Sequence, residues 1–262
     1  MIIDAHCHIY PEKIALKASQ STGNFYSIPM KYDGTISQMF EAGDEAGIDK
    51  FIVESVATTP KQVSSINHFI ADTVNQYPER LYGLGTLHPD SENIFADIEE
   101  IQILGLKGVK LHPDIQEFKL DDYRCLKIYE ICEQKNIPIL VHTGDKRYDY
   151  SNPNRLLPIL QIYKSLTFIG AHFGGWSMWV EAAEQLHGIK NLYVDCSSSF
   201  FALDDATIIK LIDMYGTDRV LFGTDYPMWS MKETVDRLKS LGYSKEDLDK
   251  IFYKNAVKVF SL

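Results

Sequence analysis

Two histidines near the start of the chain, His6 and His8, are separated by one residue and follow the short apolar segment Met-Ile-Ile-Asp-Ala. In a β-strand, residues i and i+2 project to the same face, so the two imidazoles lie side by side. Two neutral imidazoles on one rigid strand are a natural beginning of a site for a divalent transition metal. Asp4 falls on the same face by this alternation, deeper in the strand, where a structural hydrogen bond is expected.

Further polar residues close later apolar runs. His112, His142 and His172 each end such a run, and Asp225 follows the run that ends at Thr224. A His-x-His pair arises often by chance, and the value of this one depends on whether these later residues reach it. Their convergence depends in turn on the fold.

The elements that must position these residues alternate along the chain. Strand-like apolar runs cover residues 2–8, 50–56, 81–87, 107–112, 137–142, 166–172, 191–196 and 219–224. Amphipathic helical patterns cover residues 93–104, 122–135, 154–163, 176–186, 204–215, 231–241 and 245–260. This alternation predicts an α/β fold with a parallel sheet built from βα units. Eight such units in roughly 250 residues match a (β/α)₈ TIM barrel better than an open doubly wound sheet.

In such a barrel the carboxyl ends of all strands meet on one face, which carries catalysis. The histidines and Asp225 are therefore expected to converge there. No linker or internal repeat divides the chain, so residues 1–262 are expected to form a single domain. The least regular stretch, residues 10–33, is predicted to form a loop beside the active site.

The composition is that of a soluble enzyme, with 45% hydrophobic and 24% charged residues. A formal net charge of −10 argues against nucleic acid as a partner. We see neither a signal-peptide pattern nor an apolar run of the ~18 residues that a membrane span requires. The four cysteines lack Cys-x-x-Cys spacing. We therefore expect a reduced, cytoplasmic protein that binds neither nucleic acid nor membrane; a homodimer is left open.

Six segments carry a resemblance to a known family. In chain order they are IIDAHCHIYP, GLKGVKLHPD, IPILVHTGD, FIGAHFGGW, NLYVDCSS and VLFGTDYP, and they span nearly the whole chain. This series resembles the amidohydrolase superfamily. More closely, it resembles the amidohydrolase-related branch grouped with aminocarboxymuconate semialdehyde decarboxylase, whose members are TIM-barrel metal-dependent enzymes. The resemblance thus implies the fold that the alternating pattern also predicts.

The resemblance also implies roles for particular residues. One divalent ion, with Zn²⁺ preferred, would be held by His6, His8, His142 and Asp225, leaving a position for a water of lowered pKa. His172 would hydrogen-bond that water and shuttle a proton, and Asp225 would be a second candidate for the base.

Lys110 and His112 share one strand and leave two alternatives open. Some superfamily members carboxylate a lysine at this place to bridge two metals. The preferred alternative is that Lys110 pairs with a carboxylate or contacts the substrate, and Glu54, near the end of its strand, is either a pocket residue or a carboxylate at the edge of the core. His112 is either a metal or substrate group or a packed side chain. Substrate contacts are also assigned to Arg147, Trp176, Trp229 and His88.

The resemblance permits more than one reaction on a small-molecule substrate. The preferred prediction is hydrolysis, in which metal-activated water attacks an amide, ester or lactone. The alternative is metal-dependent, non-oxidative decarboxylation of an aromatic or unsaturated carboxylic acid. An inactive metal-binding scaffold is the least favoured interpretation, because the complete set of candidate ligands is present.

Overall fold

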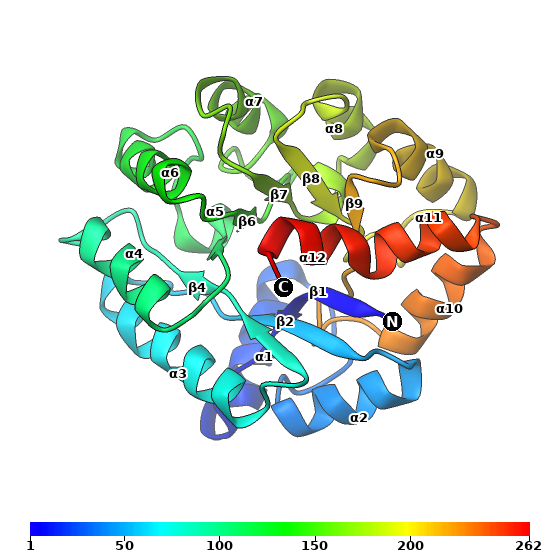
Figure 1. The fold of residues 1–262 in the computed structure, drawn as a ribbon, viewed down its shortest axis with the longest axis horizontal. Coiled ribbons are helices and arrows are strands. Elements are labelled where there is room, and N and C mark those ends of the chain that lie inside the picture. Colours follow the sequence, from blue (N-terminus) through cyan, green and yellow to red (C-terminus); the bar gives the residue numbers. More distant parts are fainter.

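The computed structural model describes residues 1–262 and shows a closed barrel of parallel strands surrounded by helices (Figure 1). The strands are β1 (Ile3–His8), β2 (Lys50–Glu54), β3 (Leu81–Gly83), β4 (Gly85–Thr86), β5 (Val109–Leu111), β6 (Ile139–Val141), β7 (Phe168–Gly170), β8 (Leu192–Asp195) and β9 (Val220–Leu221). Each pairs in parallel with the next in its sheet. Leu84 alone separates β3 from β4, which together form one barrel strand. The predicted TIM barrel is confirmed.

Backbone hydrogen bonds between the first and last strands close the barrel. The amide of Ala5 donates to the carbonyl of Phe222 over 2.9 Å, and the amide of Asp225 donates to the carbonyl of His6 over 3.0 Å. The second of these bonds ties a candidate ligand from one end of the chain to a candidate ligand from the other. The closure of the barrel therefore also assembles the site.

The helices surround the barrel and, at the end of the chain, cross one of its openings (Figure 1). They are α1 (Glu12–Tyr26), α2 (Ile36–Ala46), α3 (Val63–Gln76), α4 (Ile94–Ile103), α5 (Pro113–Gln116), α6 (Tyr123–Lys135), α7 (Pro153–Ile162), α8 (Trp179–Leu186), α9 (Asp205–Tyr215), α10 (Met231–Ser240), α11 (Lys245–Asp249) and α12 (Asn255–Phe260). A π-helical turn, Lys250–Lys254, joins α11 to α12. None of these helices has both the length and the apolar character needed to cross a membrane.

The prediction of a loop over residues 10–33 was wrong, because most of this stretch forms α1. The inward-facing positions of α1 are Ala15, Ser19, Gly23 and Tyr26, spaced at helical intervals. Three of the four are small, and Ile14 and Leu16 of the same helix are exposed. A side chain at Gly23 would clash, since a Cβ there would lie 2.7 Å from the carbonyl oxygen of Ile28. Small residues thus allow close packing but give no hydrophobic periodicity.

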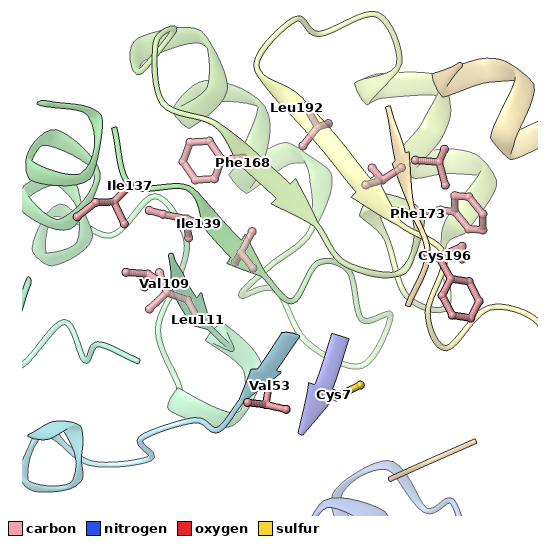
Figure 2. Packing of buried hydrophobic residues seen from close by; sticks show 14 of the residues in the cluster. Cys7, Val53, Val109, Leu111, Ile137, Ile139, Phe168, Phe173, Leu192 and Cys196 are labelled. Atoms are coloured by element: carbon pink, nitrogen blue, oxygen red, sulfur yellow. The ribbon is translucent and has the colours of Figure 1, made fainter. Parts of the chain in front are cut away.

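Two layers of apolar side chains hold the barrel. The larger cluster lies between strands and helices and includes Val53 of β2, Val109 of β5 and Phe168 of β7, which Figure 2 shows. The smaller cluster fills the barrel interior: Ile3, Ala5, Ile52, Leu84, Leu140, Ile169, Ala171, Tyr193 and Leu221, with Ala256 and Phe260 from α12. The apolar interior therefore extends to the end of the barrel that α12 covers.

An irregularity in β1 determines which of its side chains face inward. The pairing with β2 shifts by one residue between Asp4 and Cys7, which is the pattern of a β-bulge. Ala5 belongs to the interior cluster, whereas Cys7 belongs to the outer one. The prediction that Asp4 shares a face with His6 and His8 was wrong, because the bulge reverses the alternation between them. Asp4 does form structural hydrogen bonds, accepting from the amides of His6 (3.2 Å) and Thr224 (3.0 Å).

Candidate metal centre

Five residues singled out from the sequence line one cavity at the carboxyl ends of the strands. The cavity measures about 710 Å³, and the five are His6, His8, His142, His172 and Asp225. His142 directly follows β6, whereas His172 and Asp225 follow β7 and β9 with positive φ angles of 59° and 60°. Such backbone is uncommon outside glycine and concentrates at functional sites. Helix α1 forms much of the opposite wall, as expected of a segment beside the active site.

His6, His8 and Asp225 present their ligand atoms at the spacing that a single ion requires. The Nε2 atoms of the two histidines are 3.2 Å apart, and the Oδ1 atom of Asp225 lies 3.4 Å and 3.6 Å from them. Ligand atoms bound tetrahedrally at ~2.1 Å lie about 3.4 Å from one another. The residues present therefore fit a divalent ion.

Asp195 fixes the orientation of His6. Its Oδ2 atom lies 2.9 Å from Nδ1 of His6, so Nδ1 carries the proton and donates it. The Nε2 atom then presents a lone pair to the cavity. A carboxylate that orients a metal-binding histidine in this way also makes the imidazole a stronger ligand.

His142 and His172 form a second close pair. Nδ1 of His142 lies 3.0 Å from Nε2 of His172, while Nδ1 of His172 lies 3.1 Å from the carbonyl oxygen of Ser197. Because a carbonyl only accepts, Nδ1 of His172 carries the proton and its Nε2 atom holds a lone pair. His172 also lies close to His6 and Asp225, with one ligand atom of each within 4.8 Å of the others. A proton on Nδ1 of His142, donated to Nε2 of His172, satisfies both facing nitrogens.

Burial keeps these imidazoles neutral at physiological pH. It lowers the pKa of His6, His8 and His142 well below 6.5, and it lowers the pKa of His172 to about 4. The neutral form is the one that binds a metal or accepts a proton. The electrostatics of the cavity thus suit both roles.

Comparisons with known proteins show the family to which the chain belongs. The amidohydrolase family model matches residues 3–262, almost the whole chain. The chain belongs to the amidohydrolase family. It is 22% identical to a 2-amino-3-carboxymuconate-6-semialdehyde decarboxylase from Dictyostelium discoideum, over 86% of this chain and 81% of that protein.

Two solved structures illustrate the likeness in fold. An uncharacterised TIM-barrel protein from Bordetella bronchiseptica superposes with a TM-score of 0.80 at 22% identity, covering 99% of this chain and 98% of that one. A dihydroxybenzoic acid decarboxylase from a Polaromonas species, with bound manganese and the inhibitor 2-nitroresorcinol, superposes with a TM-score of 0.75 at 17% identity. The coverage is 100% of this chain and 97% of that one. At these identities the likeness shows the shared fold alone.

Within this amidohydrolase barrel, Lys110 lies beneath the ligands and forms an ion pair with Glu54. Its Nζ atom is 2.7 Å from Oε1 of Glu54 and 2.9 Å from Nε2 of His6, and both side chains of the pair are fully buried. Burial raises the pKa of Glu54 to about 8, although the positive charge of Lys110 opposes the shift. Of the two alternatives considered for Lys110 from the sequence, this ion pair matches pairing with a carboxylate.

His112 lies in the cavity wall beside His142 and differs from it in role. Its Nδ1 atom accepts from the amide of Ile115, and its Nε2 atom donates to the hydroxyl of Tyr26 over 2.8 Å. Its ring stacks on that of His142 at 4.1 Å with only 7° between the planes. An imidazole lone pair lies in the plane of its ring, so two parallel stacked rings cannot direct lone pairs at one ion. His112 and His142 therefore do not form a second metal site with the nearby Asp114.

Four residues predicted to contact the substrate do not line the cavity, namely His88, Arg147, Trp176 and Trp229. The guanidinium of Arg147 is bound by the carboxylate of Asp145 and the carbonyl of Phe25. His88 accepts from the amide of Asp90 at the edge of the barrel. Arg147 and Trp176 pack against Tyr26 of the cavity wall, and Trp229 donates to the hydroxyl of Ser198.

Sequence reasoning missed several residues that position the candidate ligands. Asp195 ends the apolar strand β8, Ser197 contacts His172, and the hydroxyl of Ser198 donates to Asp225. Asp114 lies 3.7 Å from Nε2 of His142. A buried carboxylate at the end of an apolar strand was the available signal for Asp195, since such a group needs a partner.

Proposed function

We propose that this amidohydrolase-family protein is a metal-dependent decarboxylase of a small aromatic or unsaturated carboxylic acid. This is the alternative of the two reactions considered from the sequence, and the relatives named as decarboxylases favour it over hydrolysis. The observation that carries the proposal is the group of neutral imidazoles, His172 among them, beside Asp225 at the base of a largely apolar cavity.

In this proposal His6, His8, His142 and Asp225 hold one divalent ion. Zinc suits three imidazoles and a carboxylate, and manganese is the ion bound in the Polaromonas relative. Such an ion would bind an oxygen of the substrate and take up the negative charge that develops as the carbon–carbon bond breaks. Asp195 and Ser198 would keep His6 and Asp225 in their binding orientations.

The cavity walls favour loss of a charged carboxylate as neutral carbon dioxide. Apolar side chains surround the space above the ligands: Ile14, Phe25, Ile66, Phe69, Ile115 and Met228. A carboxylate moved from water into such surroundings is destabilised unless it is paired, whereas carbon dioxide carries no charge. Exclusion of water by these walls also protects the carbon that has lost the carboxylate.

His172 is the group placed to supply the proton that replaces the carboxylate. Decarboxylation breaks one carbon–carbon bond, forms one carbon–hydrogen bond and consumes one proton from solvent. The Nε2 atom of His172 faces the cavity without a proton of its own, and Ser197 holds the ring through Nδ1. This atom can therefore take up a solvent proton and deliver it to the carbon.

Hydrolysis remains the second candidate, because the same side chains suit it. Asp225 and His172 both border the ligand array, and either could accept a proton from an attacking water. Five serine and threonine side chains also line the cavity and could orient an ester or lactone: Ser21, Thr22, Ser55, Thr58 and Ser65. Product analysis separates the two reactions.

The test is a substrate screen on protein loaded with zinc or manganese. Aromatic hydroxy acids and unsaturated dicarboxylic acids are compared with lactones, esters and amides, in D₂O, with carbon dioxide release and product mass recorded. We expect carbon dioxide and one deuterium on the carbon that carried the carboxylate. Chelator-treated protein and His172→Asn serve as controls. A product that has gained the elements of water without releasing carbon dioxide would replace decarboxylation by hydrolysis.

A further inference from the structure

Glu54 lies among the candidate metal ligands although none of the ligand motifs includes it. It ends β2, directly opposite His8 of β1 in the strand pairing, and it is 0% exposed. Its Oε1 atom is 3.3 Å from Nε2 of His6 and 3.6 Å from Nε2 of His8. These separations match those between Asp225 and the same two nitrogens, 3.4 Å and 3.6 Å.

The protein leaves this carboxylate incompletely satisfied. The ammonium of Lys110 lies 2.7 Å from Oε1 of Glu54, and Oε2 of Glu54 has no hydrogen-bond partner. A buried carboxylate normally accepts several hydrogen bonds or binds a metal. The Nε2 atom of His6 directs a lone pair at the same point and lies 2.9 Å from Nζ of Lys110, so this one lysine is shared between the imidazole and the carboxylate.

We propose that Glu54 is a direct ligand of the divalent ion, in addition to His6, His8, His142 and Asp225 of the proposed metal centre. The inference rests on the metal centre of the proposed function and adds a ligand from β2 to it. Two carboxylates then balance the charge of a divalent ion, and Lys110 stays paired with Glu54 while giving up its contact with Nε2 of His6. Lys110 thus holds the carboxylate in position when no ion is bound.

A simpler role for Glu54 would be that of counterion to Lys110. Glu54→Gln alone does not separate the two roles, because an unpaired ammonium beside the site would also repel the ion. The informative comparison is made without the lysine. Lys110→Met is therefore compared with the double variant Lys110→Met/Glu54→Gln, and metal affinity is measured by competition with a chromophoric chelator for Zn²⁺ and Co²⁺.

If Glu54 is a ligand, the double variant binds the ion at least about 100-fold more weakly than Lys110→Met, a loss beyond that of most orienting partners. The absorption spectrum of bound Co²⁺ changes as well, because the set of ligand atoms changes. Equal affinity and identical Co²⁺ spectra for the two proteins would overturn the assignment and leave Glu54 as a counterion.

A second comparison covers the case in which Lys110→Met does not fold. Glu54→Asp keeps the charge beside Lys110 but shortens the side chain by one methylene. A ligand role predicts weaker ion binding and an altered Co²⁺ spectrum, whereas a counterion role predicts wild-type values for both. His8→Ala is the positive control for loss of a ligand. Wild-type protein that binds no ion would refute the metal centre itself, and normal binding by Glu54→Asp would refute only the role of Glu54.

Discussion

The two ends of the barrel are closed by opposite kinds of side chain. At the amino end of the strands, Phe260 and Ala256 of α12 pack on Leu221 and Ile3 in a purely apolar cluster. At the carboxyl end, buried imidazoles, carboxylates and one lysine crowd together beneath the cavity. Apolar contact is non-directional and satisfied by burial alone, whereas each polar group needs a partner of the right kind.

Unsatisfied atoms distinguish the carboxyl end further. Oε2 of Glu54, Oδ1 of Asp114 and Nε2 of His142 are buried there without a hydrogen-bond partner. Such groups reduce the stability of the fold unless a ligand completes them, and sites where local rules are broken are commonly functional. The amino end of the barrel thus stabilises the fold, whereas the polar groups at the carboxyl end lower that stability and form the candidate site. The predictions below test this division.

The largest effect is expected at the apolar end. Phe260→Ala should lower the free energy of unfolding of the metal-free protein by about 3–5 kcal/mol, because it removes a large buried side chain and leaves a cavity. Chemical denaturation followed by circular dichroism measures the loss. Lys258→Ala, on an exposed position of the same helix, should change stability by no more than about 0.5 kcal/mol. A Phe260→Ala protein of normal stability would show that α12 does not contribute to the core.

The next effect belongs to the polar end and concerns turnover. His172→Asn should lower kcat at least ~10²-fold, the usual contribution of one acid–base group, while most of the metal remains bound. Its ring is held by Ser197, and its removal leaves His6, His8, His142 and Asp225 in place. Metal content by elemental analysis and kcat are measured on the same preparation. Should His172→Asn release metal as readily as His142→Ala does, His172 is a ligand, and a two-metal centre bridged by Lys110 becomes the better description.

The difference between the two ends also explains how far the sequence could be interpreted. The barrel was predictable because every strand is an apolar run, and apolar runs leave a one-dimensional signal. The same criterion failed for α1, whose buried face is made of Ala15, Ser19 and Gly23. Close packing of small residues is a property of the neighbours that a helix meets, and the sequence pattern does not reveal those neighbours.

The site was predictable only in part for a similar reason. His6, His8, His142, His172 and Asp225 are marked by their positions at strand ends, and the structure brings them to one cavity. The position of Asp4 was misjudged because a single bulged residue in β1 reverses the strand alternation. The contact between Glu54 and Lys110 joins β2 to β5 across the barrel interior, so it depends on three-dimensional closure. Contacts of this kind, between residues far apart in the chain, cannot be predicted from a single sequence.

A smaller effect is expected where the wall of the cavity is anchored. The guanidinium of Arg147 lies about 5 Å from the rings of Phe25, Tyr26 and Trp176 and donates to the carbonyl of Phe25 over 2.6 Å. These contacts fix the end of α1 over the cavity, with cation–π interactions worth about 0.5–2 kcal/mol each. Arg147→Gln should therefore raise KM up to about 10-fold, an effect of about 1.4 kcal/mol, and change kcat less.

The control for this wall is the neighbouring lysine. Lys146 makes only an exposed ion pair with Glu181, at 3.8 Å, so Lys146→Gln should leave KM unchanged. Hydrogen exchange of α1 provides a second measurement, because a released helix should exchange faster in Arg147→Gln. A fall in kcat with normal KM and normal exchange would instead mean that Arg147 contributes to the reaction and not to the wall.

The smallest effect is expected two contacts away from the ion. The indole Nε1 of Trp229 donates to the hydroxyl of Ser198 over 2.7 Å, and that hydroxyl donates to Oδ2 of Asp225. A residue that hydrogen-bonds a metal ligand directly contributes about 10–100-fold to metal affinity. A residue that is one further hydrogen bond away from the ligand should therefore contribute less than ~10-fold. Trp229→Phe should accordingly weaken ion binding by a few-fold, measured by chelator competition.

Phe201 stacks on Trp229 at 4.0 Å, and Phe201→Leu removes that packing but keeps the hydrogen bond. If Phe201→Leu weakens ion binding as much as Trp229→Phe does, packing and not the hydrogen-bond chain orients Asp225. This part of the carboxyl end would then depend on apolar contact, as the amino end does.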